Sequence, residues 1–127
     1  MSTTTRPVTF TAPPFGLEPV VDFVLDEIDG ATGLFALRSE GGQRLFVLDA
    51  SVHLGDYSPV LTDEQTALLE LETPAEALLL VVATPAESGM TVNLLAPVVV
   101  NLRTGAGAQL ILEGQDYPLR AELTPSA

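Results

Sequence analysis

The single histidine of this sequence, His53, is the residue best suited to general acid or base catalysis. Asp56 and two serines, Ser51 and Ser58, lie within five residues of it, and these types together could supply a nucleophile, a base and an acid. All four fall in one short segment, and no G-x-S-x-G turn is present to hold a serine nucleophile above a sheet. We therefore predict that His53 has no special role.

Two further patterns are typical of ion or phosphate binding, and both are incomplete. The acids that gather before Gly30 are Asp22, Asp26, Glu27 and Asp29. They miss the register of a calcium loop and lack its glutamate at the twelfth position. Gly105 and Gly107 are similar to part of a phosphate loop, yet no helix or lysine follows them. With no cysteine and one histidine, a zinc site also lacks ligands, so we expect no metal, no cofactor and no enzyme activity.

The most patterned stretch of the chain is residues 93–112, which predicts a β-hairpin. Residues 98–100 are three β-branched valines, and residues 104–107 between the two apolar runs are typical of a turn. Pro97 cannot donate a hydrogen bond to a sheet, so it should be the first residue of its strand or lie at an edge. Asn93 then lies just outside this strand.

Two asparagines, Asn93 and Asn101, interrupt the apolar residues of this stretch and could form a site or stabilise the hairpin. Asparagine at a strand end most often hydrogen-bonds the neighbouring backbone, and Gln109 could do the same across the hairpin. We favour the structural role and keep both asparagines as candidates for contact with a partner.

Short strands separated by turns account for most of the remaining chain. Alternating or apolar residues predict strands at 7–11, 21–28, 34–39, 44–50, 91–95 and 117–123. Paired glycines within residues 40–43 supply a tight hairpin turn. Residues 73–85 could open as a helix at Pro74, but the run at 78–84 favours a strand that is buried on both faces.

One helix is predicted, within residues 61–71, after an irregular segment at 51–60. Thr62 can cap it, Gln65 completes a capping box, and acids follow at the positive end of the helix. The elements together predict a mainly β fold, either a small barrel or a sandwich. We favour the barrel, namely a small antiparallel β-barrel-like single domain over residues 1–127 with one short helix. Its ordered core should extend from about residue 7 to 123.

The charge balance limits the classes of partner. Five arginines, no lysine and seventeen acids give a formal net charge of -12, which disfavours direct binding of nucleic acid. Such a surface either keeps an apolar protein soluble or suits a basic partner. No apolar run approaches the ~20 residues that span a bilayer, and the N-terminus lacks a basic and apolar leader. We expect a cytoplasmic monomer.

Several motifs are similar to those of the flagellar assembly factor FliW family, from about Val8 to Leu123. The first is Phe10, Pro13 or Pro14, Phe15 and Gly16, the second is Leu37, Arg38, Ser39 and Glu40, and the third is the pair Asp56 and Tyr57. The most specific is NLLAPVVVN at 93–101, followed by a glutamine and three aliphatic residues at 109–112. Arg38 stands where the family usually has glutamine, and Ala50 stands where it commonly has proline.

This resemblance implies a β-barrel-like, non-enzymatic, cytoplasmic protein with two alternative partners. These are flagellin and the translational repressor CsrA, an RNA-binding protein with a basic RNA surface. In the family scheme, cytosolic flagellin captures FliW and leaves CsrA free to repress flagellin mRNA. When flagellin is exported, FliW is released and sequesters CsrA.

The candidate partner-binding residues are of two kinds. Asp56 and Tyr57 lie in an irregular segment, where binding residues are common, although Tyr57 could equally tie the loop to the core. The others are the surface acids and the two asparagines, namely Glu70, Glu72, Glu76, Glu87, Asn93 and Asn101.

A rival hypothesis is a small-ligand-binding β-barrel or a non-catalytic subunit of an enzyme complex. Small barrels are usually filled by side chains, and the leucine and valine content suffices to fill one. A packed barrel interior would therefore argue against the ligand-binding hypothesis.

Overall fold

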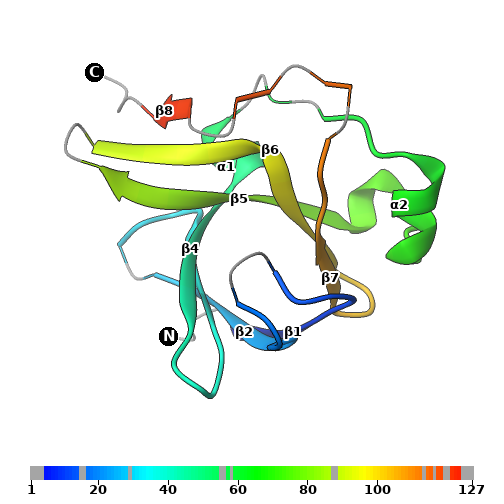
Figure 1. Ribbon diagram of the computed structural model, residues 1–127, viewed down its shortest axis with the longest axis horizontal. Helices are drawn as coiled ribbons and strands as arrows, with labels where there is room; N and C mark the ends of the chain where they lie inside the picture. Colours follow the sequence, from blue (N-terminus) through cyan, green and yellow to red (C-terminus); the bar gives the residue numbers. More distant parts are fainter. Residues whose placement is uncertain are drawn as a thin grey trace.

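The computed structural model describes residues 5–14, 17–28, 30–54, 57, 59–86, 89–112, 114–115, 117–118 and 121–123. The strands are β1 (Thr5–Phe10), β2 (Asp22–Glu27), β3 (Leu34–Arg38), β4 (Arg44–Asp49), β5 (Ala77–Ala86), β6 (Gly89–Asn101), β7 (Ala106–Gln109) and β8 (Ala121–Leu123). The helices are α1 (Ala50–His53), α2 (Asp63–Leu68) and the 3-10 helix η1 (Pro74–Glu76) (Figure 1). No helix in the described ranges is long and apolar enough to cross a membrane.

Seven of the described strands close into a barrel, as the sequence predicted. Antiparallel pairing runs from β1 through β2, β3, β4 and β5 to β6 and then to β7. A short parallel pairing of β7 with β1 completes the ring. At this seam a Cβ on Gly107 would lie 2.7 Å from the Val8 side chain, so the second glycine of the 105–107 motif is required by packing. β8 adds to the far end of β6.

The interior of the barrel is packed with side chains. It is filled by Val8, Phe10, Phe23, Leu25, Phe35, Leu37, Val47, Leu80, Val98 and Val100, all of them buried. The rings of Phe10 and Phe23 meet edge to face with centroids 5.4 Å apart. A barrel interior filled by the described side chains in this way argues against the small-ligand-binding hypothesis.

The longest strand pair, β5–β6, extends beyond the barrel and is covered on both faces. Leu80 and Val98 face the interior, whereas Leu79 and Val99 face outward against a second apolar cluster. The outer half of the pair packs with β4, α1 and β8 through a third cluster that includes Val81 and other residues. The prediction of a strand buried on both faces is confirmed for β5, and it explains the unbroken apolar run.

Strand β6 corrects the predicted positions of Pro97 and Asn93. The strand begins at Gly89, so neither the start of the strand at Pro97 nor the place of Asn93 outside it is correct. The register shifts between Leu80 and Val82, which leaves residues 94–97 of β6 opposite a single residue of β5. A bulge of this kind tolerates proline because its missing N–H has no ladder partner, and the Pro97 carbonyl still accepts from the Leu110 N–H at 2.9 Å.

Helix α2 has the predicted capping box and is a short helix within the predicted range of residues 61–71. The Thr62 hydroxyl accepts from the Gln65 N–H at 3.1 Å, and the Gln65 side chain accepts from the Thr62 N–H at 2.9 Å. The helix ends at Leu68, and two residues later Glu70 has a φ of 53°, a conformation that usually requires glycine. Hydrogen bonds to the Glu70 carbonyl from Asn101 and Arg103 hold this conformation.

Two short helical turns were missed or only partly predicted. The segment expected to be irregular begins with α1, which Asp49 caps by accepting from the Ser51 N–H at 2.9 Å. A helical turn does begin at Pro74, as one of the two alternatives predicted, but it is the single 3-10 turn η1. Strand β5 follows it as predicted. Four and three residues give too little periodicity to be read from sequence.

Candidate functional site

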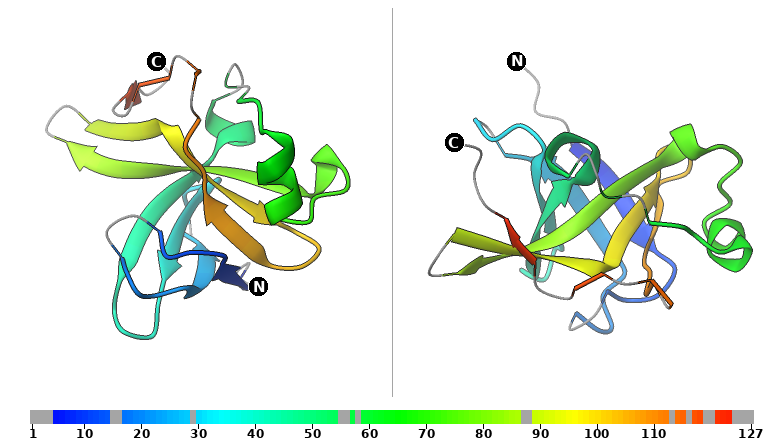
Figure 2. Two further views of the ribbon diagram at one scale, coloured as in Figure 1. Left: turned by 45° about the vertical axis from the view of Figure 1, so that its right-hand side comes forward. Right: turned by 90° about the horizontal axis from the view of Figure 1, so that it is seen from above.

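The segment of residues 57 and 59–73, here called the cover, lies over the outward face of β5, β6 and β7. Leu69 is buried against Val99, Ala108 and Leu110, with Leu61 and other leucines packed around them. Both views of Figure 2 place α2, which belongs to the cover, outside the barrel. The cover therefore forms a second layer on the strand pair that the barrel already uses.

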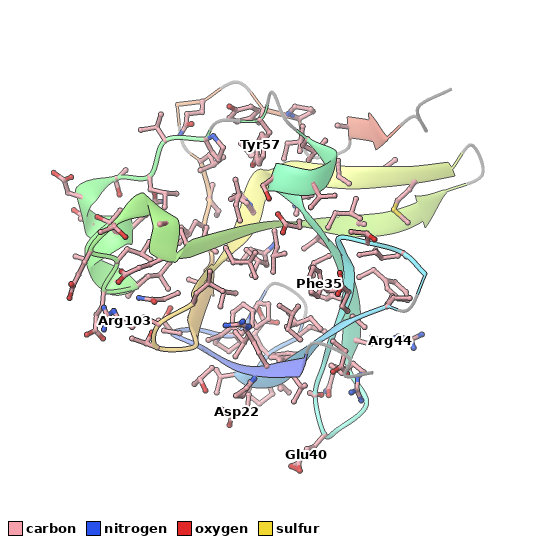
Figure 3. All side chains as sticks on the ribbon, turned by 180° about the vertical axis from the view of Figure 1, so that it is seen from behind. Asp22, Phe35, Glu40, Arg44, Tyr57 and Arg103 are labelled. Atoms are coloured by element: carbon pink, nitrogen blue, oxygen red, sulfur yellow. The ribbon has the colours of Figure 1, made fainter. Side chains whose placement is uncertain are left out.

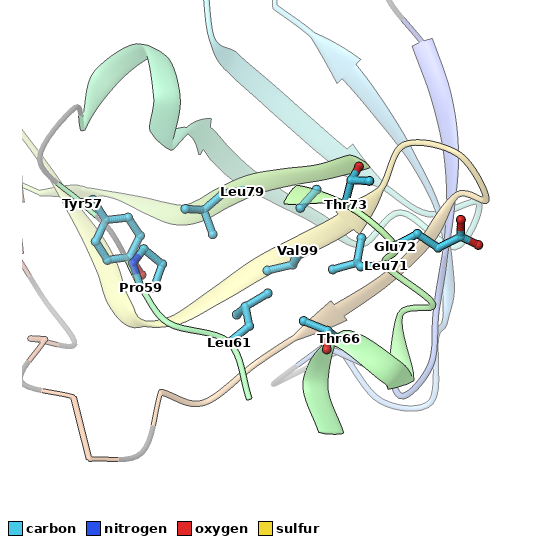
Figure 4. A pocket seen from close by; sticks show the side chains of 10 residues that line it. Tyr57, Pro59, Leu61, Thr66, Leu71, Glu72, Thr73, Leu79 and Val99 are labelled. Atoms are coloured by element: carbon cyan, nitrogen blue, oxygen red, sulfur yellow. The ribbon is translucent and has the colours of Figure 1, made fainter. Parts of the chain in front are cut away.

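An open groove of about 620 Å³ lies between the cover and the sheet. Its lining residues are Tyr57, Pro59, Leu61, Thr66, Leu71, Glu72, Thr73, Ala77, Leu79 and Val99 (Figure 4). The aliphatic and aromatic side chains come from both the cover and the strands, and the polar ones come from the cover alone. The groove is outside the packed barrel interior.

Asn101 anchors the cover to the turn between β6 and β7. Its side chain is 0% exposed, and its Nδ2 donates to the carbonyls of Leu69 at 2.7 Å and Glu70 at 3.2 Å. Its Oδ1 accepts from the N–H groups of Arg103 at 2.8 Å and Thr104 at 3.3 Å. A side chain used in this way has a structural role, and none of its surface faces a partner.

Asn93 holds the bulge of β6. Its Oδ1 accepts from the N–H groups of Leu95 at 3.1 Å and Ala96 at 3.0 Å. Across the hairpin, Gln109 donates to the Ala96 carbonyl at 3.1 Å, which is the role predicted for it. Both asparagines of the sequence motif thus satisfy backbone groups where the strand becomes irregular.

Arg103 brings together three of the predicted acids. Its guanidinium lies 3.0 Å from the Glu76 carboxylate and 3.5 Å from that of Glu72, and it donates to the Glu70 carbonyl at 2.8 Å. A hydrogen bond from the Glu72 N–H and then the contact with Arg103 lower the pKa of Glu76. Glu76 is therefore a structural carboxylate, whereas Glu70 and Glu72 are exposed.

Arg103 was missed by the sequence reasoning, although a signal was present. It is the only cationic residue between positions 45 and 119, a stretch rich in acids. Figure 3 shows it at the turn between β6 and β7, well separated from Glu40 at the tip of the β3–β4 hairpin.

Tyr57 lies at the other end of the cover and has the structural role considered for it, because it ties this segment to the core. Its hydroxyl donates to the Leu94 carbonyl, and its ring meets that of Tyr117 edge to face with centroids 4.9 Å apart. Burial, and secondarily Tyr117, raise the pKa of Tyr57 above its ordinary value. The half-buried ring also lines the groove.

The remaining candidates fall partly outside the structure's description. Asp56 and Glu87 lie outside the described residues, as do Ser58 and Asp29, and of His53 only the backbone at the end of α1 is described. Within the described ranges, no group of three histidine, cysteine or acidic residues is placed to hold a metal ion.

The anchoring role of Asn101 predicts a large effect on stability. Asn101→Ala removes four hydrogen bonds. The Glu70 carbonyl keeps its bond from Arg103, but the Leu69 carbonyl and the N–H groups of Arg103 and Thr104 lose the Asn101 partner, so the free energy of unfolding should fall by about 3 kcal/mol. Asn93→Ala removes two hydrogen bonds at a more exposed position and should cost about 1 kcal/mol. Urea denaturation with an unchanged m-value measures both. Equal and small losses for the two variants would contradict the anchoring role.

The buried hydroxyl of Tyr57 predicts a stability loss in alkali. The pKa of Tyr57 is higher in the folded state than in the unfolded state, so the unfolded state loses the hydroxyl proton first. The contribution of Tyr57 to the free energy of unfolding is therefore complete below the ordinary tyrosine pKa of about 10 and is lost as the pH rises above it. The chain has no lysine or cysteine and only two tyrosines, so few other groups titrate there. Between about pH 9 and 11, the wild type should lose more unfolding free energy than Tyr57→Phe. Identical pH profiles for the two proteins would exclude the effect.

Comparisons with known proteins place the chain in a family. The sequence profile of the FliW protein family matches residues 2–123. A flagellar assembly factor FliW of Azoarcus sp. (strain BH72) is 34% identical over 117 residues, which cover 83% of this chain and 80% of that protein. One from Desulfitobacterium hafniense (strain DSM 10664 / DCB-2) is 43% identical over 74 residues, which cover 57% of this chain and 49% of that protein. For the strain Y51 protein, which is 35% identical over 91 residues, the matched part is 70% of this chain and 60% of the relative.

A solved structure agrees with these matches. The crystal structure of a flagellar assembly factor FliW superimposes with a TM-score of 0.84 and 26% sequence identity, covering 94% of this chain and 86% of that chain. The mainly β barrel is therefore shared, and the resemblance predicted from the motifs is confirmed. The chain belongs to the FliW family of flagellar assembly factors.

Proposed function

We propose that this protein is a cytoplasmic partner switch in flagellar assembly. It binds the translational regulator CsrA and antagonises the repression of flagellin mRNA, and it alternatively binds cytosolic flagellin. The observation that carries the proposal is the family match over residues 2–123. The switch needs no enzyme activity and no cofactor, because its output is which partner is bound.

The distribution of charge supports a basic partner. Residues 45–102 contain eight acids and no arginine or lysine. On the cover, Asp63, Glu64, Glu70 and Glu72 are exposed. Negative potential on this surface attracts a basic protein and repels RNA, so binding beside the RNA surface of CsrA would weaken its hold on RNA.

The packed barrel supports a function that is performed at the surface. A small-ligand-binding barrel needs interior space, and here side chains from six of the seven barrel strands occupy the interior. The described surface instead offers an open groove and exposed acids, which suit a protein ligand.

The proposal predicts complexes with both partners and a salt-dependent effect on RNA binding. The purified protein should form one complex with monomeric flagellin and another with CsrA, measured by size exclusion and calorimetry. It should also lower the affinity of CsrA for flagellin mRNA. Because CsrA itself loses RNA affinity with salt, the quantity to compare is the ratio of RNA affinities without and with this protein at each salt concentration.

The double variant Glu70→Gln, Glu72→Gln should reduce the ratio of CsrA's RNA affinities without and with this protein. The reduction should be about twofold to fivefold at about 0.05 M salt and smaller at about 0.3 M, where exposed charges are screened. Glu40→Gln, at the tip of the distant β3–β4 hairpin, is the matched control and should leave the ratio unchanged. No complex with either partner would remove the proposal. If the double variant still binds CsrA and the ratio is unchanged at every salt concentration, the electrostatic mechanism is wrong. Direct occlusion of the RNA surface would then explain the effect on RNA binding.

A further inference from the structure

We propose that the outer face of the β3–β4 hairpin binds an extended acidic segment of a partner protein. Two arginines of this face, Arg38 and Arg44, take the carboxylates of that segment. Figure 3 shows Arg44 and Arg103 on opposite sides of the molecule, so this face is remote from the acids beside the cover. The inference does not rest on the proposed function.

The strand register places the two arginines side by side. Arg38 of β3 is directly opposite Arg44 of β4, so both side chains project from the same face of the sheet, and both are exposed. The chain has five arginines, no lysine and seventeen acids, yet here two cations are neighbours. Like charges in opposite positions destabilise a sheet, and proteins keep such unfavourable arrangements mainly at functional sites.

A hollow of about 410 Å³ lies at these two residues and is here called the arginine hollow. It is lined by Arg38, Ser39, Gly42, Gln43 and Arg44, so no carboxylate of the described chain lines it. The Ser39 hydroxyl donates to the Gln43 side-chain oxygen at 2.5 Å, and no described group accepts a hydrogen bond from the Gln43 side-chain nitrogen. The lining side chains therefore offer mainly donors, which suits an anion.

Arg44 is the cation of the arginine hollow that no described acid neutralises. Arg38 forms an ion pair with Asp26, whereas none of the described carboxylates is paired with Arg44. The Arg44 guanidinium instead lies over the ring of Phe46, 5.0 Å from its centroid. This contact restricts the side chain before a ligand arrives, so less conformational freedom is lost on binding.

An apolar groove beside the arginine hollow favours a peptide over a small anion. This second groove has a volume of about 640 Å³ and shares Arg38, Ser39 and Gln43 with the hollow. Much of its remaining lining is apolar and includes Pro7 and Val24 of the outer barrel face. A small anion would occupy the hollow alone, whereas a peptide with acidic and apolar residues can occupy both.

Two acids of the second groove determine which part of the peptide lies where. Asp22 accepts from the Thr9 hydroxyl at 3.3 Å, and Glu40 lies at the tip of the hairpin (Figure 3). Both line the second groove and neither lines the arginine hollow. The acidic residues of the segment therefore lie at the hollow, and its apolar residues lie in the second groove.

The spacing of the two arginines matches acids at alternate positions of an extended segment. Directly opposite residues have Cβ atoms about 5 Å apart. Side chains two residues apart on an extended chain project from the same side with a spacing of about 6.6 Å. Arginine and glutamate side chains are flexible enough to bridge this difference, so two alternate carboxylates can each reach one guanidinium.

The test uses synthetic peptides of about eight residues, which span about 26 Å when extended. The first has glutamate at two alternate positions followed by valines, the second has glutamine in place of glutamate, and the third has the first composition with the glutamates adjacent. NMR titration of the ¹⁵N-labelled protein at about 0.05 M salt gives the affinity and the place of contact. The first peptide should bind despite the protein's net charge of -12, with shifts at Ser39, Gln43 and Arg44. It should bind about fivefold more tightly than the other two.

Variants of the arginines separate the site from general electrostatics. Arg44→Gln should weaken the first peptide about threefold to fivefold, and Arg38→Gln, Arg44→Gln about tenfold. Arg44→Lys keeps the charge without the planar donor group and should weaken it about twofold. The matched control Arg6→Gln removes the same charge from a residue that lines neither the hollow nor the second groove, and should change the affinity less than about 1.5-fold. Circular dichroism and melting confirm that each variant folds.

Several outcomes would overturn the inference. These are no binding of the first peptide, equal binding of the glutamine peptide, shifts elsewhere on the protein, and equal effects of Arg44→Gln and Arg6→Gln. Inorganic phosphate is titrated in parallel, and equal shifts at equal concentration would make the hollow a general anion site. Self-association of the protein that Arg44→Gln abolishes would assign the site to a second copy of the chain instead.

Discussion

The β5–β6 pair is apolar on both of its faces, so two separate layers must cover it. Leu80 and Val98 point into the barrel, and Leu79 and Val99 point to the cover. Burying one face requires the sheet to close, while burying the other requires residues 57 and 59–73 to lie down on its outside. Asn101, at the end of β6, joins the two requirements because its side chain holds the end of α2 at the turn where the barrel strand finishes.

This arrangement gives the molecule a packed barrel and, outside it, a second layer formed by the cover. Side chains from six of the seven barrel strands fill the barrel interior, whereas the cover has exposed acids and borders the groove, and Arg103 lies beside it at the turn between β6 and β7.

The features that depend on local chemistry were predictable from the sequence. The capping box of Thr62 and Gln65, the glycine turn at 40–43 and the apolar run of β5 each act within a few residues. The wrong predictions concern features that depend on contacts between residues far apart in the sequence. Pro97 lies within a strand because a bulge removes the need for its N–H, and a bulge depends on the register with β5.

The residue types of the candidate site could be predicted from the sequence, whereas their arrangement in space could not. Glu70, Glu72 and Glu76 were selected for their charge, but only the fold brings them to Arg103 and makes Glu76 structural. Asn101 was weighed correctly toward a structural role because asparagine at a strand end commonly satisfies backbone groups. The groove itself had no signal in the sequence, since its lining combines the cover with strands up to 42 residues further along the chain.

Native-state hydrogen exchange tests most directly the claim that a separable cover lies on a stable strand pair. Amides of residues 79–82 and 98–100 should exchange only through global unfolding, with free energies equal to that from urea denaturation. Amides of Thr66, Leu69 and Leu71 should exchange at a lower free energy, which Asn101→Ala should reduce further relative to global unfolding. Cover amides that exchange only with the β5–β6 amides, in both the wild type and the variant, would contradict the account.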